Sequence, residues 1–194
     1  PAGRRVGLRQ APWLASTSRA QRSGAPLHIV PDIAALAPDM KAWRHHLHAH
    51  PELSFQEHET SAFLFELLGG MEGIELERPT ETSLVAIMRT GRPGKTLALR
   101  ADIDALPIQE ETGLEFASEN PGVMHACGHD GHTAMLLAAL NALHERRDEL
   151  SGEIRFIFQH AEELGPGGAC QLVEAGVMDG VDLVVGAHLF SLDP

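Results

Sequence analysis

The stretch from Met124 to Thr133, MHACGHDGHT, concentrates side chains that bind metal ions or carry out acid–base chemistry. Such a cluster is compatible with three kinds of site: a zinc knuckle, a cysteine nucleophile with its histidine base, or part of a metal site completed from elsewhere. Cys127 and His129 are separated by one residue, a spacing at which an extended segment or a turn can direct both side chains to one centre and a helix cannot. The spacing therefore favours two ligands on a loop.

The first two alternatives agree less well with the rest of the chain. A zinc knuckle needs a second Cys or His pair nearby, and Cys170, the other cysteine, has no ligand at that spacing. As a nucleophile, Cys127 would have its pKa raised by nearby acidic residues unless a cation were bound. We therefore expect a metal centre, and we expect the dipole of the helix that follows to lower the pKa of the thiol.

Further residues that suit metal binding follow the predicted strands. In open α/β sheets, reactive groups collect beyond the carboxyl ends of the strands. The residues in question are Asp102, Asp104, Glu162, Glu163 and His188. Thiolate, imidazole and carboxylate together suit Zn²⁺, Mn²⁺ or a related ion. Adjacent acids that leave a strand point in different directions, so one can bind metal while the other faces a water molecule.

An alternation of helices and strands must position these residues. We predict strands at Ser83–Met88, Thr96–Leu99, Glu153–Phe158 and Val181–Val185, and helices at Asp39–His50, Gln56–Leu68, Thr133–Arg147 and Gly168–Ala175. Gly91–Gly94 predicts a hairpin between the first two strands. The order ααββαβαβ indicates an α/β fold with a mixed, largely parallel sheet flanked by helices.

Composition and charge limit the possible partners. The chain of 194 residues is 43% hydrophobic and carries a net charge of −12, with no apolar run long enough to span a membrane. Residues 1–25 hold five arginines and no acid, which leaves −17 on the remainder, and we expect them to form a disordered basic tail. An acidic body argues against nucleic acid or membrane as a partner. Two cysteines without a CxxC pair predict a reducing, cytoplasmic setting.

Five segments, in order, carry a resemblance to a known family. They read WRHHLHAHPELSFQEHET, ALRADIDALPIQE, PGVMHACGHDGHTAMLLAAL, GEIRFIFQHAEELGPGGA and VDLVVGAHL. This pattern resembles the M20 metallopeptidases, in the amidohydrolase branch of hippurate hydrolases, N-acyl-amino-acid deacylases and plant auxin-conjugate hydrolases. The resemblance covers about Met40 to His188. It implies that residues 26–194 are the N-terminal part of a zinc-peptidase-like catalytic domain.

The resemblance also implies roles for individual residues. The implied ligands of two divalent ions, Mn²⁺ or Zn²⁺, are Cys127, His129, Glu163 and His188. Glu162 would be the general base, and Asp104 would orient a metal-binding histidine. His125, Asp130 and His132 are expected not to be ligands, and His132 to support the site. The implied reaction is hydrolysis of the amide of a small N-acyl amino acid, such as hippurate, to a carboxylate and a free amino acid by a metal-activated water.

Histidines outside the motif receive a structural interpretation. His48 and Glu52 match an RxxLHxxPE segment that borders the site in the family, and we expect no metal binding by the other histidines of that segment, His45, His46 and His50. Relatives typically have proline in place of His160, and we expect this histidine to face solvent.

Length separates this chain from the family pattern. The family continues with a lid domain, used for dimerisation and substrate binding, and a last metal-binding histidine, whereas this chain ends at Pro194. We expect the lid to be absent, and the parent enzyme to be a homodimer or homotetramer through it. The alternative is an inactive truncated fragment that acts only as a metal-binding or scaffolding domain.

Overall fold

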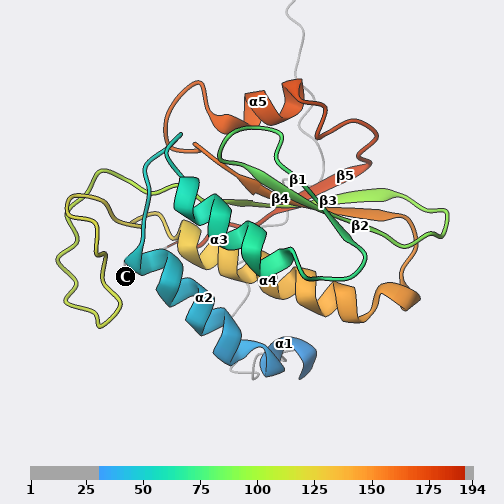
Figure 1. The fold of residues 1–194 in the computed structure, drawn as a ribbon, viewed down its shortest axis with the longest axis horizontal. Coiled ribbons are helices and arrows are strands. Elements are labelled where there is room, and N and C mark those ends of the chain that lie inside the picture. The colour runs from blue at the N-terminus through green and yellow to red at the C-terminus, as the bar shows by residue number, and fades with distance from the viewer. Residues whose placement is uncertain (1–30, 191–194) are drawn as a thin grey trace, which may run out of the picture. The chain divides into compact units, whose positions relative to one another are not determined.

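The computed structural model describes residues 31–190 (Figure 1). The predicted basic tail, residues 1–25, lies outside the described residues. In the part of the chain that is described, no helix combines the length and apolar character needed to cross a bilayer.

A five-stranded sheet with the order β1-β2-β4-β3-β5 forms the centre of the fold. The strands are β1 (Ile74–Glu77), β2 (Leu84–Arg89), β3 (Thr96–Asp102), β4 (Glu153–Gln159) and β5 (Leu183–Gly186). The pairs β1–β2 and β2–β4 are antiparallel, whereas β4–β3 and β3–β5 are parallel. The predicted mixed sheet with parallel later strands is therefore confirmed, and β1 is a strand that the sequence analysis missed.

The predicted hairpin between β2 and β3 is wrong, because β4 lies between these two strands. Phe156 of β4 is paired with Ala86 on one side and Leu99 on the other. The start of β4 also separates the ends of the connecting segment: Gly152 N–H donates to Arg92 O at 2.9 Å, and Glu153 N–H donates to Lys95 O at 3.1 Å. Pairing along the sheet is thus decided by a distant strand rather than by the Gly91–Gly94 turn.

Helices cover both faces of the sheet (Figure 1). They are α1 (Pro31–Ala35), α2 (Ala37–Ala49), α3 (His58–Leu68), α4 (His129–Glu145) and α5 (Gly168–Glu174), with a short 3₁₀ turn at Arg147–Glu149. Helices α2, α3 and α4 lie on one side, and α5 lies on the other. The sequence analysis missed α1 and placed the start of α4 four residues too late, at Thr133.

Strand β2 shows how the two faces are packed. Leu84, Ala86 and Met88 belong to the core beneath α3 and α4, whereas Val85 and Ile87 pack in a second core under α5. All five side chains are at most 4% exposed. Since successive strand residues point to opposite faces, burial of both sets requires helices on both sides. This rigid centre supports the loops at the carboxyl ends of β3 and β4.

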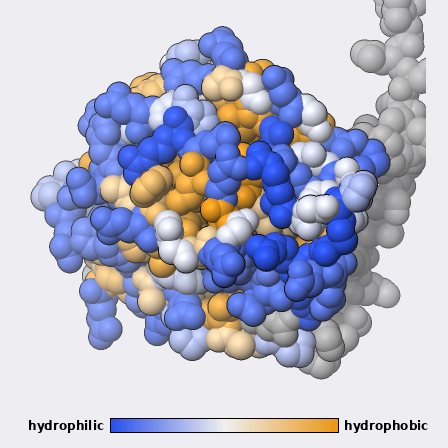
Figure 2. All heavy atoms as spheres, turned by 45° about the vertical axis from the view of Figure 1, so that its right-hand side comes forward, coloured by the Kyte–Doolittle hydropathy of each residue, from blue (hydrophilic) through white to orange (hydrophobic). Residues whose placement is uncertain are grey.

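The last strand is less well covered. Leu183, Val184 and Val185 of β5 are 59%, 47% and 47% exposed. Beyond β3, no described strand pairs with β5. Figure 2 shows that hydrophobic residues also gather within an otherwise largely hydrophilic face. The described residues therefore leave apolar surface uncovered, most clearly along one edge of the sheet.

Candidate metal centre

The structure brings the predicted site residues to one edge of the sheet. Asp104 follows β3, Glu162 and Glu163 follow β4, and His188 follows β5. Cys127 lies on the loop just before α4, and His129 is the first residue of α4. Four segments far apart in sequence therefore meet, as expected for the carboxyl ends of neighbouring strands in an α/β sheet.

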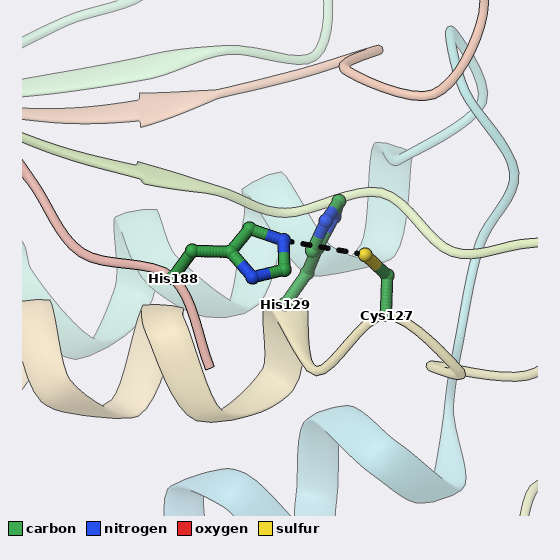
Figure 3. A group of neighbouring side chains, drawn as sticks. All are labelled: Cys127, His129 and His188. Carbon is green, nitrogen blue, oxygen red and sulfur yellow. Dashed lines mark hydrogen bonds between the residues drawn. The ribbon is translucent and has the colours of Figure 1, made fainter. Parts of the chain in front are cut away.

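Cys127, His129 and His188 form one group of possible ligands (Figure 3). One ligand atom from each residue lies within 4.8 Å of the others. The Sγ atom of Cys127 is 3.4 Å from Nε2 of His188. Figure 3 shows His129 rising from the first turn of α4, with Cys127 on the loop before it and His188 on the loop after β5. The loop before α4, the first turn of α4 and the loop after β5 thus direct one sulfur and two nitrogen atoms to a common point.

His129 also belongs to a second group, with Glu162 and Glu163. Its Nε2 atom is 3.7 Å from Oε1 of Glu163 and 3.9 Å from Oε2 of Glu162. Within the described residues, Nε2 of His129 and Oε1 of Glu163 are buried and have no hydrogen-bond partner. Buried polar atoms are normally paired, so two unpaired acceptors that face each other suit a cation between them. The donor set therefore fits a divalent metal ion.

Asp104 fixes the orientation of His129. Its carboxylate is 3.2 Å from Nδ1 of His129 and accepts hydrogen bonds from Ser54 Oγ at 2.6 Å and Glu163 N–H at 3.0 Å. Burial opposes ionisation of Asp104, but these hydrogen bonds outweigh it and lower the pKa of the carboxyl group. An ionised Asp104 accepts a proton-bearing Nδ1, which leaves the Nε2 lone pair of His129 directed at the site.

The thiol of Cys127 has an environment that disfavours the thiolate. Burial, a hydrogen bond with Glu163 and the negative charges of Glu163 and Glu162 raise the pKa of Cys127 to about 12. The acidic residues raise this pKa, as the sequence analysis expected for a site without a cation, and together with burial they outweigh any lowering by the dipole of α4. A thiolate nucleophile is therefore disfavoured, whereas a bound cation would reverse these charge effects.

Leu189 connects His188 to the start of α4. A Cβ atom at Gly131 would lie 2.5 Å from Cδ1 of Leu189, so any larger residue there would displace the tip of this side chain. The N–H of Leu189 donates to Nε2 of His132 at 2.8 Å, while Nδ1 of His132 lies 2.5 Å from Oδ1 of Asp102. Both nitrogens of His132 are thus engaged. Although Asp102, His129 and His132 also lie within ligand distance of one another, His132 has no free lone pair for a metal.

A network of charges ties α2 to the first turn of α4. His48, which is 4% exposed, places Nδ1 2.8 Å from Oδ2 of Asp130 and Nε2 3.2 Å from Oε1 of Glu110. Arg44 Nε donates to the same oxygen of Asp130 at 3.0 Å. The hydrogen bond with Asp130 raises the pKa of His48 despite its burial. This network, whose members Arg44 and Glu110 the sequence analysis missed, fixes the residue that follows His129.

The expectation that His160 faces solvent is wrong. Its side chain is 1% exposed, and its Nε2 atom lies 2.9 Å from Oε1 of Gln171 in α5. A Cβ atom at Gly168 would lie 2.6 Å from Nδ1 of His160, so the first residue of α5 leaves room for the imidazole. Among the described residues, His160 is in none of the groups that could hold a metal. It packs α5 against the end of β4.

Comparisons with known proteins agree with this arrangement. Residues 98–193 match the model of Peptidase family M20/M25/M40. The chain is 63% identical over 153 residues to the N-acyl-L-amino acid amidohydrolase of Geobacillus stearothermophilus, a match that covers 79% of this chain and 41% of that protein. It is 52% identical over 154 residues to thermostable carboxypeptidase 1 of Saccharolobus solfataricus, covering 78% and 39% of the two chains.

A solved structure shows the same fold. The Bacillus subtilis YXEP protein, described as a dinuclear metal-binding peptidase of the M20 family, superposes with a TM-score of 0.76 at 46% identity. The match covers 80% of this chain and 44% of that one. The chain thus spans about two fifths of the length of the curated relatives that it matches.

Proposed function

Because the chain belongs to the M20 family of peptidases and amidohydrolases, we propose that it supplies most of the metal centre of a longer amidohydrolase. The observation that carries the proposal is the pair of buried, unpaired atoms, Nε2 of His129 and Oε1 of Glu163, 3.7 Å apart. Cys127 and His188 complete the set of donors around His129.

Four residues would hold two divalent ions in this proposal: Cys127, His129, Glu163 and His188. Bound there, the ions would polarise the amide carbonyl and lower the pKa of water. The thiolate favours Zn²⁺, while the carboxylates also suit Mn²⁺. Asp104 keeps His129 in the tautomer that presents Nε2, and it holds the backbone of Glu163 at the same time.

Glu162 has the position that a general base requires. Its side chain is 43% exposed, compared with 23% for Glu163, yet its Oε2 atom remains 3.9 Å from Nε2 of His129. Glu162 is therefore open to solvent water while it stays close to a proposed metal ligand, which supports the role of general base. We assign to it removal of a proton from the attacking water and delivery of that proton to the leaving amine.

The proposed substrates are small N-acyl amino acids, which the enzyme would cleave to a carboxylate and a free amino acid. The name of the Geobacillus relative supports this class, and the Saccharolobus carboxypeptidase adds peptides with a free carboxyl end as candidates. Hippurate, benzoylglycine, is the first compound to test. A cytoplasmic setting, a homodimer or homotetramer through a lid domain, and a single catalytic domain over residues 26–194 stay predictions.

A second candidate is a metal-binding or scaffolding protein without turnover. The observation that favours it is the exposure of His188, which leaves this side of the centre open to solvent within the described residues. Both candidates bind metal, so only turnover separates them.

The test combines metal content with activity. Elemental analysis of the purified 194-residue chain should find bound Mn²⁺ or Zn²⁺, and the full-length protein should hydrolyse N-acyl amino acids. Glu162→Gln should retain the metal and lower kcat by about 10²- to 10⁴-fold. Glu174→Gln, on the exposed side of α5, is the matched control and should leave kcat unchanged. Full activity of Glu162→Gln would contradict the base assignment, and metal without turnover in the wild type would favour scaffolding.

A further inference from the structure

We propose that Glu57 is a positioning residue that sets the direction of the turn carrying Glu162 and Glu163. The inference rests on the proposed function, because these two carboxylates matter only if they serve the metal centre. The geometry behind it concerns the backbone before Glu162, and the family resemblance assigned no role to Glu57.

The turn begins with an unusual backbone conformation. Ala161 has a φ angle of +46°, in the left-handed region that residues other than glycine seldom adopt. Such a conformation persists only when surrounding contacts hold it. Because φ of Ala161 sets the course of the chain that follows, its value determines where Glu162 and Glu163 point. The contacts of Ala161 therefore determine the direction of the turn that carries Glu162 and Glu163.

Both backbone polar groups of Ala161 are held in place. Its N–H donates to Oε1 of Glu57 at 2.7 Å, and its carbonyl accepts from Gly168 N–H at 2.8 Å. Asp104 accepts the N–H of Glu163 at 3.0 Å, on the other side of Glu162. The turn is thus fixed at two points by carboxylates, Glu57 before the proposed base and Asp104 after it.

The side chain of Glu57 is buried in the interior, where it makes this contact. It is 0% exposed and stands immediately before α3, and its second oxygen, Oε2, accepts from Thr82 Oγ1 at 2.8 Å. Fully buried carboxylates are costly unless hydrogen-bonded, and each oxygen of Glu57 has a donor. One side chain therefore joins three segments: the start of α3, the approach to β2 and the turn after β4.

The loop that carries Glu57 also contacts Asp104, the carboxylate that holds the turn after Glu162. Ser54 Oγ donates to Asp104 at 2.6 Å, only three residues before Glu57. Phe55, between Ser54 and Glu57, has a φ angle of +64° and is a second residue other than glycine in the left-handed region. Residues 54–57 thus support the turn from both ends. Their side chains contribute no atom to the candidate ligand groups of the described residues.

The experiment compares Glu57→Ala and Glu57→Gln in the 194-residue chain. The readouts are Mn²⁺ and Zn²⁺ affinity by calorimetry and hydrogen exchange of the amides of residues 161–163 by NMR. Glu57→Ala should speed exchange of these amides and weaken metal binding about 10- to 100-fold, the usual effect of losing a partner that orients a ligand. Glu57→Gln retains an acceptor for Ala161 N–H and should restore most of the affinity.

Leu64→Ala is the matched control for loss of stability, because Leu64 is fully buried in α3 and, as an apolar core residue, forms no side-chain hydrogen bond with the turn. Its affinity, corrected for the folded fraction, should equal that of the wild type. Equal losses in Glu57→Ala and Leu64→Ala, or unchanged affinity in Glu57→Ala, would overturn the inference.

If Glu57→Ala does not fold, the decisive pair is Glu57→Gln and Thr82→Val. The first weakens the bond to Ala161 N–H, since a charged acceptor is replaced by a neutral one, and the second leaves that bond intact. Faster exchange of the Ala161 amide is expected only in Glu57→Gln, and equal exchange in both would overturn the inference. If the wild-type chain binds no metal, the proposed function fails, and amide exchange alone decides the role of Glu57.

Discussion

The candidate metal centre has a buried half and an exposed half, which are held in different ways. His129 and Asp104 are at most 1% exposed, and hydrogen bonds from other segments fix Asp104 and the backbone of Glu163. Cys127 and His188 stand on loops and are nearer the surface, with a 3.4 Å contact between them. The buried half is therefore preorganised by hydrogen bonds inside the fold, whereas the exposed half is held by loops that are open to solvent.

The largest effect is expected when the histidine of the buried half is removed. His129→Ala should lower the affinity for Mn²⁺ or Zn²⁺ by more than about 100-fold, because His129 belongs to every group of possible ligands among residues 31–190. His188→Ala should lower it less. Calorimetric titration of both variants, with circular dichroism to verify folding, measures the difference. A larger loss in His188→Ala would invert the comparison.

The next effect concerns the support of the buried half. Asp104→Asn should weaken metal binding about 10- to 100-fold, because the tautomer of His129 is no longer fixed by a carboxylate. It should also speed hydrogen exchange at the amide of Glu163, whose N–H Asp104 accepts. Asp148→Asn, an exposed change in the 3₁₀ turn, serves as the control. Normal affinity in Asp104→Asn would show that packing alone orients His129.

Acid should weaken the contacts behind the buried half. Burial opposes ionisation of Asp130, but His48 and Arg44 lower its pKa to about 2, below its ordinary value of 3.8. A depressed carboxyl pKa stabilises the folded state above the ordinary value, and this contribution of about 2 kcal/mol is lost as the pH falls from about 4 towards 2. Urea unfolding of the wild type and Asp130→Asn between pH 5 and 2 measures it. Parallel curves for the two proteins would contradict the assignment.

The smallest effect on stability is expected in the exposed half. Cys127→Ser should change the free energy of unfolding of the metal-free chain by no more than about 0.5 kcal/mol, because the site is near the surface and the change is small. It should nevertheless reduce the metal content found by elemental analysis. Unchanged metal content would remove Cys127 from the ligand set, and a large loss of stability would show that the exposed half also supports the fold.

The sequence predicted the sheet class and the gathering of site residues because both follow from local patterns. Apolar runs identified four strands, and the rule for strand ends located Asp104, Glu163 and His188 on one edge. The pairing of the strands could not be predicted in the same way. The partner of β2 is β4, which is far along the chain, and the turn-forming Gly91–Gly94 segment does not indicate that β4 lies between β2 and β3.

Burial and helix starts depended on tertiary contacts that a single sequence does not display. His160 is buried because Gly168 leaves space and Gln171 supplies a partner. Gly131 weakens the local helix signal, yet α4 begins at His129, where Leu189 packs on that glycine. Glu57 gave no signal either, since an acid just before a helix is ordinarily a surface residue.

Strand β5 gives the protein a property separate from its chemistry. Within the described residues, no strand pairs with its outer edge along Leu183–Gly186, and the strand has exposed apolar side chains and no charge. An edge of this kind is a template for strand addition between molecules, and only its four-residue length limits it. Strand addition at this edge would involve four residues that end two positions before His188, outside the ligand set.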